Sequence, residues 1–320
     1  MLMTGATAAE VQRGAARSMF RVESTIASPA AKTEATPAHP KPVSTGYGEV
    51  NGMKLYHEMH GEGDPLVLLH GGLMTIGEMA PLIQALAGHR KVIAVELQGH
   101  GRTADTDRPL KLETMGDDIA ALIEDLGLGQ ADIVGYSLGG DVALRTAIQH
   151  PDRVRRLVVL STPFARNGWY PEVLEGMAQV NATMADQLKE TPTGVAARNW
   201  PEPERFPQFL DKLGAMLQED YDWSAEVRKL KMPVMLVYAD HDAISTRHIA
   251  EFFALLGGGL KDPGWQNTQL TNARLAIVPG YSHYNFTTAP ELGPIIEGFL
   301  ADPLTKPRGG EAAAASKAAK

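Results

Sequence analysis

Short, mostly apolar runs alternating with helical patterns are the feature that most limits the folds open to this chain. The runs cover residues 66–69, 92–95, 132–134, 157–160, 234–238 and 275–278. Such runs suit parallel strands, because helices bury both faces of a parallel sheet. Helical patterns are found at 78–87, 112–126, 138–149, 246–256 and 290–300. The alternation predicts an α/β fold, a mostly parallel sheet with helices on both faces, built from right-handed βαβ crossovers.

One interval departs from this alternation. Residues 165–231 contain no convincing parallel strand, only helical pattern with proline breaks. We therefore expect an inserted helical cap, or lid, between two parts of the core at 45–164 and 232–303. Its aromatic and methionine side chains favour a partly apolar pocket, although residues at helical spacing equally often only pack. They are Trp169, Tyr170, Met177, Met184, Trp200, Phe206, Phe209, Tyr221 and Trp223.

The two ends of the chain and one hairpin complete the predicted organisation. Residues 1–44 are rich in Ala, Thr, Ser and Pro and have too little bulky apolar surface to offset their ordering entropy, which predicts a disordered leader. Residues 304–320 are expected to be a flexible tail. An Asn-Gly turn at 51–52 between 46–50 and 53–60 predicts a β-hairpin at the start of the core.

Composition excludes several classes of function. The 320-residue chain has 30 Lys and Arg against 38 Asp and Glu, a net charge of −8, which argues against a nucleic-acid partner. It has no cysteine, so disulfides, thiolate nucleophiles and Cys-based zinc sites are ruled out. No apolar run is long enough to span a membrane. Glu10 and Arg13 interrupt the place of a signal-peptide core, which favours the cytoplasm.

The sequence Gly-Tyr-Ser-Leu-Gly-Gly at 135–140 carries the strongest chemical signal. It directly follows the predicted strand 132–134 and opens the predicted helix 138–149. This is the strand–turn–helix context of a G-x-S-x-G nucleophile elbow, in which Gly135 and Gly139 avoid clashes across a sharp turn. We therefore predict that Ser137 is a nucleophile. A tight turn with an incidental serine is the alternative.

A glycine pair after another predicted strand supplies a second element of the chemistry. His-Gly-Gly at 70–72 follows the run 66–69, where the backbone can turn an N–H toward a reacting carbonyl oxygen. Gly72 N–H and Leu138 N–H are predicted to form an oxyanion hole. A plain strand-ending turn is the alternative.

Among the ten histidines, His283 is best placed to act as the base for Ser137. It follows the last predicted strand on a loop, at the sheet edge where ligands of α/β folds bind. His248 falls within a predicted helix and is expected to be exposed. The orienting acid is Asp240 or Asp242, both after the strand 234–238, and spacing alone does not decide between them. Asp242 lies further into the loop and is favoured.

Together these residues resemble the α/β-hydrolase superfamily. The resemblance covers about 45–300 and includes the motifs above, Gly-His-Gly-Arg at 99–102, Ala-Asp-His-Asp at 239–242 and Pro-Gly-Tyr-Ser-His at 279–283. It implies Asp242 as the acid, Gly72 as the first oxyanion donor, a cap after the sixth strand and no catalytic role for His100. The chain order Ser…Asp…His is also that of the superfamily.

The resemblance implies a carboxylesterase-type enzyme that needs no cofactor and no metal. We expect a small-to-medium ester as the substrate, cleaved through an acyl-enzyme. A lactonase, a C–C bond hydrolase, a cofactor-free haloperoxidase or perhydrolase, and a non-catalytic binding module are the alternatives. The oligomeric state and the natural ester stay open. The long loop 257–272 follows a helix that starts from the carboxyl edge, so we expect it on the opposite side, away from the site, as decoration or a contact surface.

Overall fold

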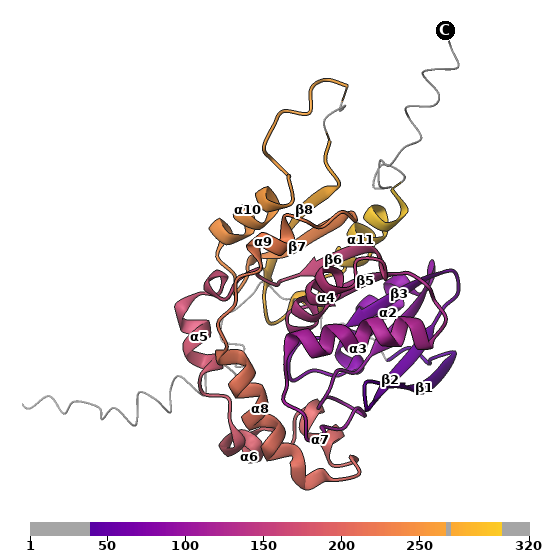
Figure 1. Ribbon diagram of the computed structural model, residues 1–320, viewed down its shortest axis with the longest axis vertical. Helices are drawn as coiled ribbons and strands as arrows, with labels where there is room; N and C mark the ends of the chain where they lie inside the picture. Colours follow the sequence, from indigo (N-terminus) through magenta and orange to yellow (C-terminus); the bar gives the residue numbers. More distant parts are fainter. Residues whose placement is uncertain (1–38, 267–269, 303–320) are drawn as a thin grey trace, which may run out of the picture.

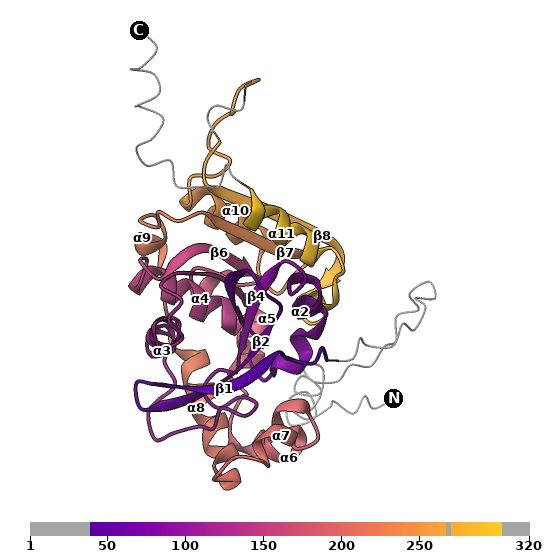
Figure 2. The same cartoon turned by 90° about the vertical axis from the view of Figure 1, so that its right-hand side faces the viewer.

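A single sheet of eight strands organises the molecule, a computed structural model that describes residues 39–266 and 270–302. Its strand order is β1-β2-β4-β3-β5-β6-β7-β8, and β1 and β8 lie at opposite ends of the sheet (Figure 2). The strands are β1 (Ser44–Val50), β2 (Met53–His60), β3 (Asp64–Leu69), β4 (Arg90–Val95), β5 (Ala131–Tyr136), β6 (Val154–Leu160), β7 (Val234–His241) and β8 (Ala273–Ser282). The pairs β1–β2 and β2–β4 are antiparallel, and all other pairs are parallel. The predicted α/β fold is confirmed.

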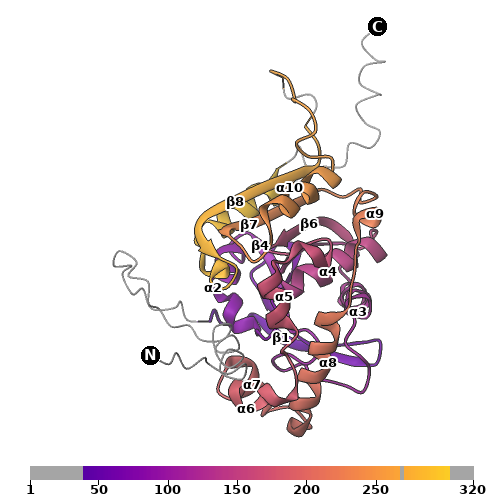
Figure 3. The same ribbon diagram turned by 90° about the vertical axis from the view of Figure 1, so that its left-hand side faces the viewer.

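Apolar side chains on both faces of the strands divide the core into two layers. On β5, for example, Ile133 belongs to one buried cluster and Val134 to the other. The first cluster includes side chains from α3 (Leu112–Asp125), α4 (Leu138–Gln149) and α10 (Thr246–Leu255), which lie along one face (Figure 3). The second includes side chains from α2 (Ala80–Leu86) and α11 (Leu292–Ala301). Burial on both sides explains why these strands read as continuous apolar runs.

The inserted segment 165–231 is helical, and the strand-like pairings described for it are two isolated bridges, Ala165 with Asp222 and Trp169 with Ile244. Its helices are α5 (Pro171–Met177), α6 (Ala185–Leu188), α7 (Pro192–Ala197), α8 (Phe206–Gln218) and α9 (Ser224–Val227), with short 3-10 turns η2 (Arg166–Gly168), η3 (Ala182–Met184) and η4 (Pro203–Arg205). Figure 1 shows α6, α7 and α8 at one end of the molecule, whereas α9 lies beside α10. Phe209 of α8 is fully buried in the first cluster, and its ring meets that of His100 edge-on at 5.0 Å. The segment therefore packs directly on the core.

The predicted ends of the chain fall largely outside the described residues. The tail 304–320 lies outside them entirely, as does most of the leader 1–44. The boundary at residue 44 needs correction, because Ser44 already belongs to β1 and Val43 N–H donates to Met59 O at 2.8 Å. The described parts of the loop 257–272 project from the end of the molecule opposite α6 and α7 (Figures 1 to 3). No helix among the described residues is both long and apolar enough to cross a membrane.

The expectation of an exposed His248 is wrong. The side chain is buried on the same face of α10 as Phe252, and its ring stacks on Phe164 with 4.0 Å between centroids. Its Nε2 accepts the Phe164 N–H at 3.2 Å. Burial lowers the pKa of His248 to about 4, so the ring is neutral at physiological pH. A lone histidine in a helix gives no periodic signal, whereas the Phe164 N–H supplies the polar partner that makes burial possible.

Candidate active site

The turn between β5 and α4 holds Ser137 in a backbone conformation that few side chains adopt. Ser137 has φ 52° and ψ −120°, a strained geometry that typically costs about 1–3 kcal/mol. A Cβ on Gly139 would lie 2.5 Å from His70 O and 2.6 Å from Leu69 O, and a Cβ on Gly135 would collide with Gly139 O. Glycine is thus required at both positions because the elbow packs against its own start and against the end of β3.

His283 reaches the Ser137 hydroxyl from the loop after β8. Its Nε2 lies 3.0 Å from Ser137 Oγ, although the two residues are 146 positions apart in the sequence. The His283 ring is buried and contacts Trp169 edge-on, with 5.4 Å between centroids. Tyr136 lies beside the same ring, and its hydroxyl donates to the His283 carbonyl oxygen. Contacts with Tyr136 of β5 and with Trp169 of the inserted segment thereby fix the position of the His283 ring.

Two aspartates at the end of β7, Asp240 within the strand and Asp242 just after it, have different environments. Asp242 is buried, and its Oδ1 lies 3.0 Å from His283 Nδ1. Asp240 instead accepts the Gly280 N–H at 2.9 Å and pairs with the exposed ring of His241. The pairing of β7 with β8 shifts register between Ala239 and His241, at the point where the side chains of Asp240 and Asp242 take different directions. Asp242 therefore faces the imidazole, and Asp240 ties the end of β7 to the last part of β8, just before His283.

Two further groups hold the Asp242 carboxylate and had escaped the sequence analysis. Ser161 Oγ donates to Asp242 Oδ2 at 2.6 Å, and Ala239 N–H donates to the same oxygen at 3.1 Å. Ser161 is fully buried at the end of β6 with φ 51°. Hydrogen bonds to both oxygens fix the plane of the carboxylate, which keeps Oδ1 directed at the ring. The only sequence signal for Ser161 is its place just after a buried strand.

Gly72 and Leu138 lie next to each other beside the serine. A Cβ on Gly72 would lie 3.7 Å from Leu138 Cβ. Leu138 is the first residue of α4, so its N–H has no acceptor within the helix. Gly72 lies in the turn that follows β3, before the short helix η1 (Ile76–Met79). The backbones of the two residues therefore lie close together beside the elbow.

Two buried histidines hold the turn that contains Gly72. His70 Nδ1 lies 2.7 Å from Gly71 O, and its Nε2 accepts the Leu97 N–H at 3.1 Å. His100 Nε2 accepts the Leu73 N–H at 3.1 Å. Since an accepting nitrogen carries no proton, both rings are neutral with the proton on Nδ1. Burial, reinforced by the neighbouring His70, lowers the pKa of His100 to about 3. His100 thus supports the turn without reaching Ser137, a contact that the motif alone did not reveal.

A buried carboxyl group lies in the first turn of α4, close to Ser137. Asp141 Oδ1 is 3.5 Å from the Tyr221 hydroxyl of the inserted segment. Burial raises the pKa of Asp141 well above its ordinary value, so the carboxyl group is favoured in its neutral form.

The sheet topology and the arrangement around Ser137 define a class, and the chain belongs to the α/β-hydrolase family. The family model described as "alpha/beta hydrolase fold" matches residues 64–199. The chain is 30% identical over 277 residues to a Caulobacter sp. (strain K31) protein with the provisional name carbamate hydrolase RutD, covering 76% of this chain and 93% of that protein. It is 32% identical over 245 residues to the pimeloyl-[acyl-carrier protein] methyl ester esterase of Neisseria meningitidis serogroup B / serotype 15 (strain H44/76), covering 70% of this chain and 87% of the esterase.

A solved structure shows the same fold. Carboxylesterase CesB (YbfK) from Bacillus subtilis aligns with a TM-score of 0.62 at 21% identity, over 82% of this chain and 93% of CesB. At this identity the likeness concerns the fold.

Proposed function

We propose that the protein is a serine hydrolase that cleaves small-to-medium carboxylic esters through an acyl-enzyme. The observation that carries this proposal is the continuous line from Ser137 Oγ to His283 Nε2, and from His283 Nδ1 to Asp242 Oδ1, with both distances 3.0 Å. Hydrogen-bond contact between nucleophile and base, with a third group orienting the base, is the arrangement that activates a serine.

In the first step, Ser137 Oγ attacks the ester carbonyl carbon as its proton moves to His283 Nε2. Asp242 accepts the Nδ1–H and stabilises the imidazolium cation. The carbonyl oxygen becomes an anion that accepts hydrogen bonds from Gly72 N–H and Leu138 N–H. The imidazolium then gives its proton to the departing alcohol. Water attacks the acyl-enzyme by the same route and releases the acid, which restores Ser137.

Two observations support ester substrates: the names of similar proteins and the apolar side chains near the serine. The relatives include a methyl ester esterase and the structural neighbours a carboxylesterase. The buried Trp169 side chain lies against His283, and Met184 belongs to the same apolar cluster as Leu138. We propose that the inserted segment 165–231 acts as a lid that supplies an apolar wall for a small or medium acyl or alcohol group.

The test is a panel of p-nitrophenyl esters with wild type and Ser137→Ala, together with a fluorophosphonate probe. We expect wild type to hydrolyse short or medium esters and to be labelled, and Ser137→Ala to lose at least about 10⁴-fold in kcat without labelling. Circular dichroism checks that the variant is folded. Full activity in Ser137→Ala would place the nucleophile elsewhere. Lactones, an aryl carbamate, a C–C ketone substrate and peroxide with acetate complete the panel, and faster turnover of one of these would replace the ester assignment.

The two aspartates offer a matched pair of variants for the acid. Asp242→Asn removes the charge that stabilises the imidazolium and should reduce kcat by about 10⁴-fold. Asp240→Asn changes a nearby carboxylate at the end of β7 that contacts Gly280 and His241 and should reduce kcat far less. The measurement is kcat for the best ester of the panel at saturating concentration. A larger loss in Asp240→Asn would overturn the assignment of Asp242.

A further inference from the structure

Three possible metal ligands gather at β2, two of them on the strand and one from the segment before β1. Tyr56, Glu58 and His60 alternate along β2 and therefore share one face of the sheet. Tyr56 belongs to the same buried cluster as residues of α2, which identifies this face. His39 reaches the same point from the segment just before β1. The ligand atoms of His39, Glu58 and His60 lie within 4.8 Å of one another.

Both imidazoles converge on one oxygen of Glu58. Glu58 Oε2 lies 2.7 Å from His39 Nε2 and 3.1 Å from His60 Nε2. His60 Nδ1 is buried and has no hydrogen-bond partner in the described part of the chain, so Nε2 is the His60 nitrogen with a polar contact. A carboxylate oxygen facing two imidazole nitrogens presents the donor types that zinc and related divalent ions prefer.

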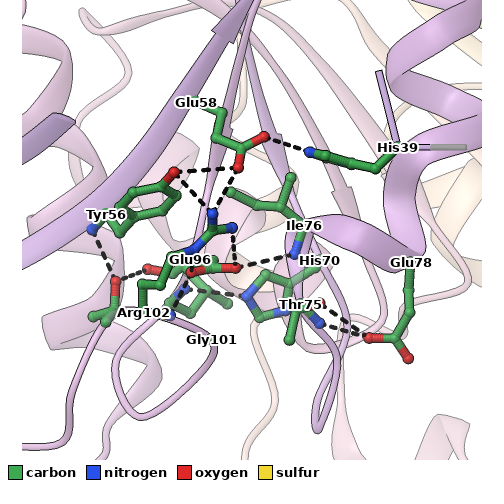
Figure 4. Close-up of polar contacts among 12 residues, drawn as sticks. His39, Tyr56, Glu58, His70, Thr75, Ile76, Glu78, Glu96, Gly101 and Arg102 are labelled. Atoms are coloured by element: carbon green, nitrogen blue, oxygen red, sulfur yellow. Dashed lines mark hydrogen bonds and ion pairs between the residues drawn. The ribbon is translucent and has the colours of Figure 1, made fainter. Parts of the chain in front are cut away.

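The other oxygen of Glu58 is held by separate groups. Arg102 Nη1 lies 2.9 Å from Glu58 Oε1, and the Tyr56 hydroxyl donates to it at 3.2 Å. Figure 4 shows Glu58 between His39 on one side and Arg102 with Tyr56 on the other. Partners of this kind orient a ligating carboxylate. Oε2 is thereby left to the two histidines.

The charges around the cluster balance in favour of a cation. Arg102 Nη2 also pairs with the buried Glu96 at 2.9 Å. Two carboxylates, Glu58 and Glu96, thus face one guanidinium. With neutral histidines, the group carries one net negative charge. A divalent ion at Oε2 would be attracted by this net negative charge. Arg102 contacts Oε1, the other oxygen of Glu58, and so leaves the position at Oε2 open.

We propose that His39 Nε2, Glu58 Oε2 and His60 Nε2 bind a divalent transition-metal ion of the zinc type, with water at a fourth position. Bonds of about 2.0–2.2 Å in tetrahedral geometry require ligand atoms about 3.3 Å apart. The two contacts to Oε2, at 2.7 and 3.1 Å, need to open by about 0.6 and 0.2 Å to reach this spacing. When the ion binds, each neutral imidazole keeps its proton on Nδ1 and presents the free Nε2 lone pair to the metal.

Such an ion would fasten the segment before the sheet to β2. His39 is followed by Pro40 and Pro42, which restrict the backbone, and Val43 N–H already donates to Met59 O at 2.8 Å. An ion that binds only the folded protein stabilises it by mass action. In the order of the sheet, β4 and β3 separate β2 from β5, which leads to Ser137. The site is therefore structural and independent of ester hydrolysis.

The test uses untagged full-length protein that has been stripped with a chelator and then titrated with zinc chloride against a chromogenic zinc chelator. We expect wild type to bind one zinc ion per chain and to melt at a higher temperature with zinc. His39→Ala removes a partly exposed side chain and should fold normally, yet bind zinc at least about tenfold more weakly. His89→Ala, which removes an exposed histidine elsewhere, is the matched control and should retain wild-type affinity.

The outcomes are distinct. Equal zinc affinity in wild type and His39→Ala, or no stoichiometric binding by wild type, would reduce the cluster to a hydrogen-bonded contact and overturn the proposal. Ser137→Ala should bind zinc like wild type, so the result does not depend on the proposed hydrolytic function.

Discussion

Ser161 is expected to act on the reaction indirectly, by positioning the carboxylate of Asp242 that contacts His283. Its hydroxyl donates to Asp242 Oδ2, while the other oxygen of the same carboxylate faces His283. Loss of this donor would leave a buried carboxylate with one partner fewer and with freedom to rotate. Its effect should therefore appear in the rate of the chemical step and not in substrate binding.

We expect Ser161→Ala to lower kcat about tenfold with little change in KM, because a hydrogen bond to a charged group contributes about 1.5–3 kcal/mol. Ser224→Ala, at the start of α9, removes a hydroxyl elsewhere and serves as the control. The measurement is steady-state kinetics across pH. An unchanged kcat and pH profile in Ser161→Ala would show that Ala239 N–H alone positions Asp242.

At the residue scale, sequence patterns singled out Ser137, Asp242 and His283, and the structure brings these three side chains into contact. Each lies at or just after the end of a readable strand. They did not locate Ser161, Tyr136 or the contact of His100 with Leu73. These side chains act through contacts between strands or loops that are distant in sequence. No local spacing encodes such contacts, since they depend on which strands become neighbours.

At the scale of elements, close approach between α4 and the end of β3 sets the position of the elbow. Gly139 lies in α4 with the carbonyl oxygens of Leu69 and His70 directly against it. The helix can approach β3 only because this position lacks a side chain. The same approach brings Leu138 beside Gly72.

Gly139→Ala should therefore destabilise the protein by about 1–3 kcal/mol or more and reduce kcat, as overpacking pushes the helix off the strand. Gly298→Ala is the matched control, because Gly298 also lies in a helix, α11, where an added Cβ would meet open space. That change should be neutral or stabilising by up to about 1 kcal/mol. Urea unfolding measures both, and equal stability of the two variants would contradict the packing argument.

The order of elements was predictable, whereas their spatial arrangement was only partly so. All the predicted apolar runs lie within strands, since burial on both faces leaves a continuous pattern. The placement of β4 between β2 and β3 was not readable, because it depends on how each crossover returns to the sheet. The helices of the inserted segment were recognisable, but the packing of Phe209 on His100 was not.

At the scale of the whole molecule, buried neutral histidines link stability to pH. Burial lowers the pKa of His100 to about 3 and that of His248 to about 4. In the unfolded chain a histidine titrates near about 6.5. Below that pH these histidines bind protons in the unfolded state but stay neutral in the folded state, so acidification favours unfolding through them.

We therefore expect these two histidines to lower the free energy of unfolding as pH decreases from 7 to 5, by up to about 1.4 kcal/mol per pH unit for each. Their stabilising contribution is complete above about pH 6.5. The raised pKa of Asp141 acts in the opposite direction, because the folded state then binds a proton that the unfolded state lacks. His248→Gln removes one histidine and leaves Asp141, so its stability should fall less on acidification than that of wild type. Urea unfolding at each pH is the measurement, and the same pH dependence in wild type and His248→Gln would refute the expectation.

The separation of 146 residues between Ser137 and His283 also bears on how the protein matures. His283 follows β8, which pairs only with β7 at one end of the sheet. If Ser137 and His283 act together as proposed, a chain emerging from the ribosome contains the nucleophile before the strand that leads to the general base, so hydrolysis would begin only after β8 has docked. Recovery of hydrolysis during refolding would then report the docking of β8, and local detachment of this edge strand would abolish activity while most of the structure persists.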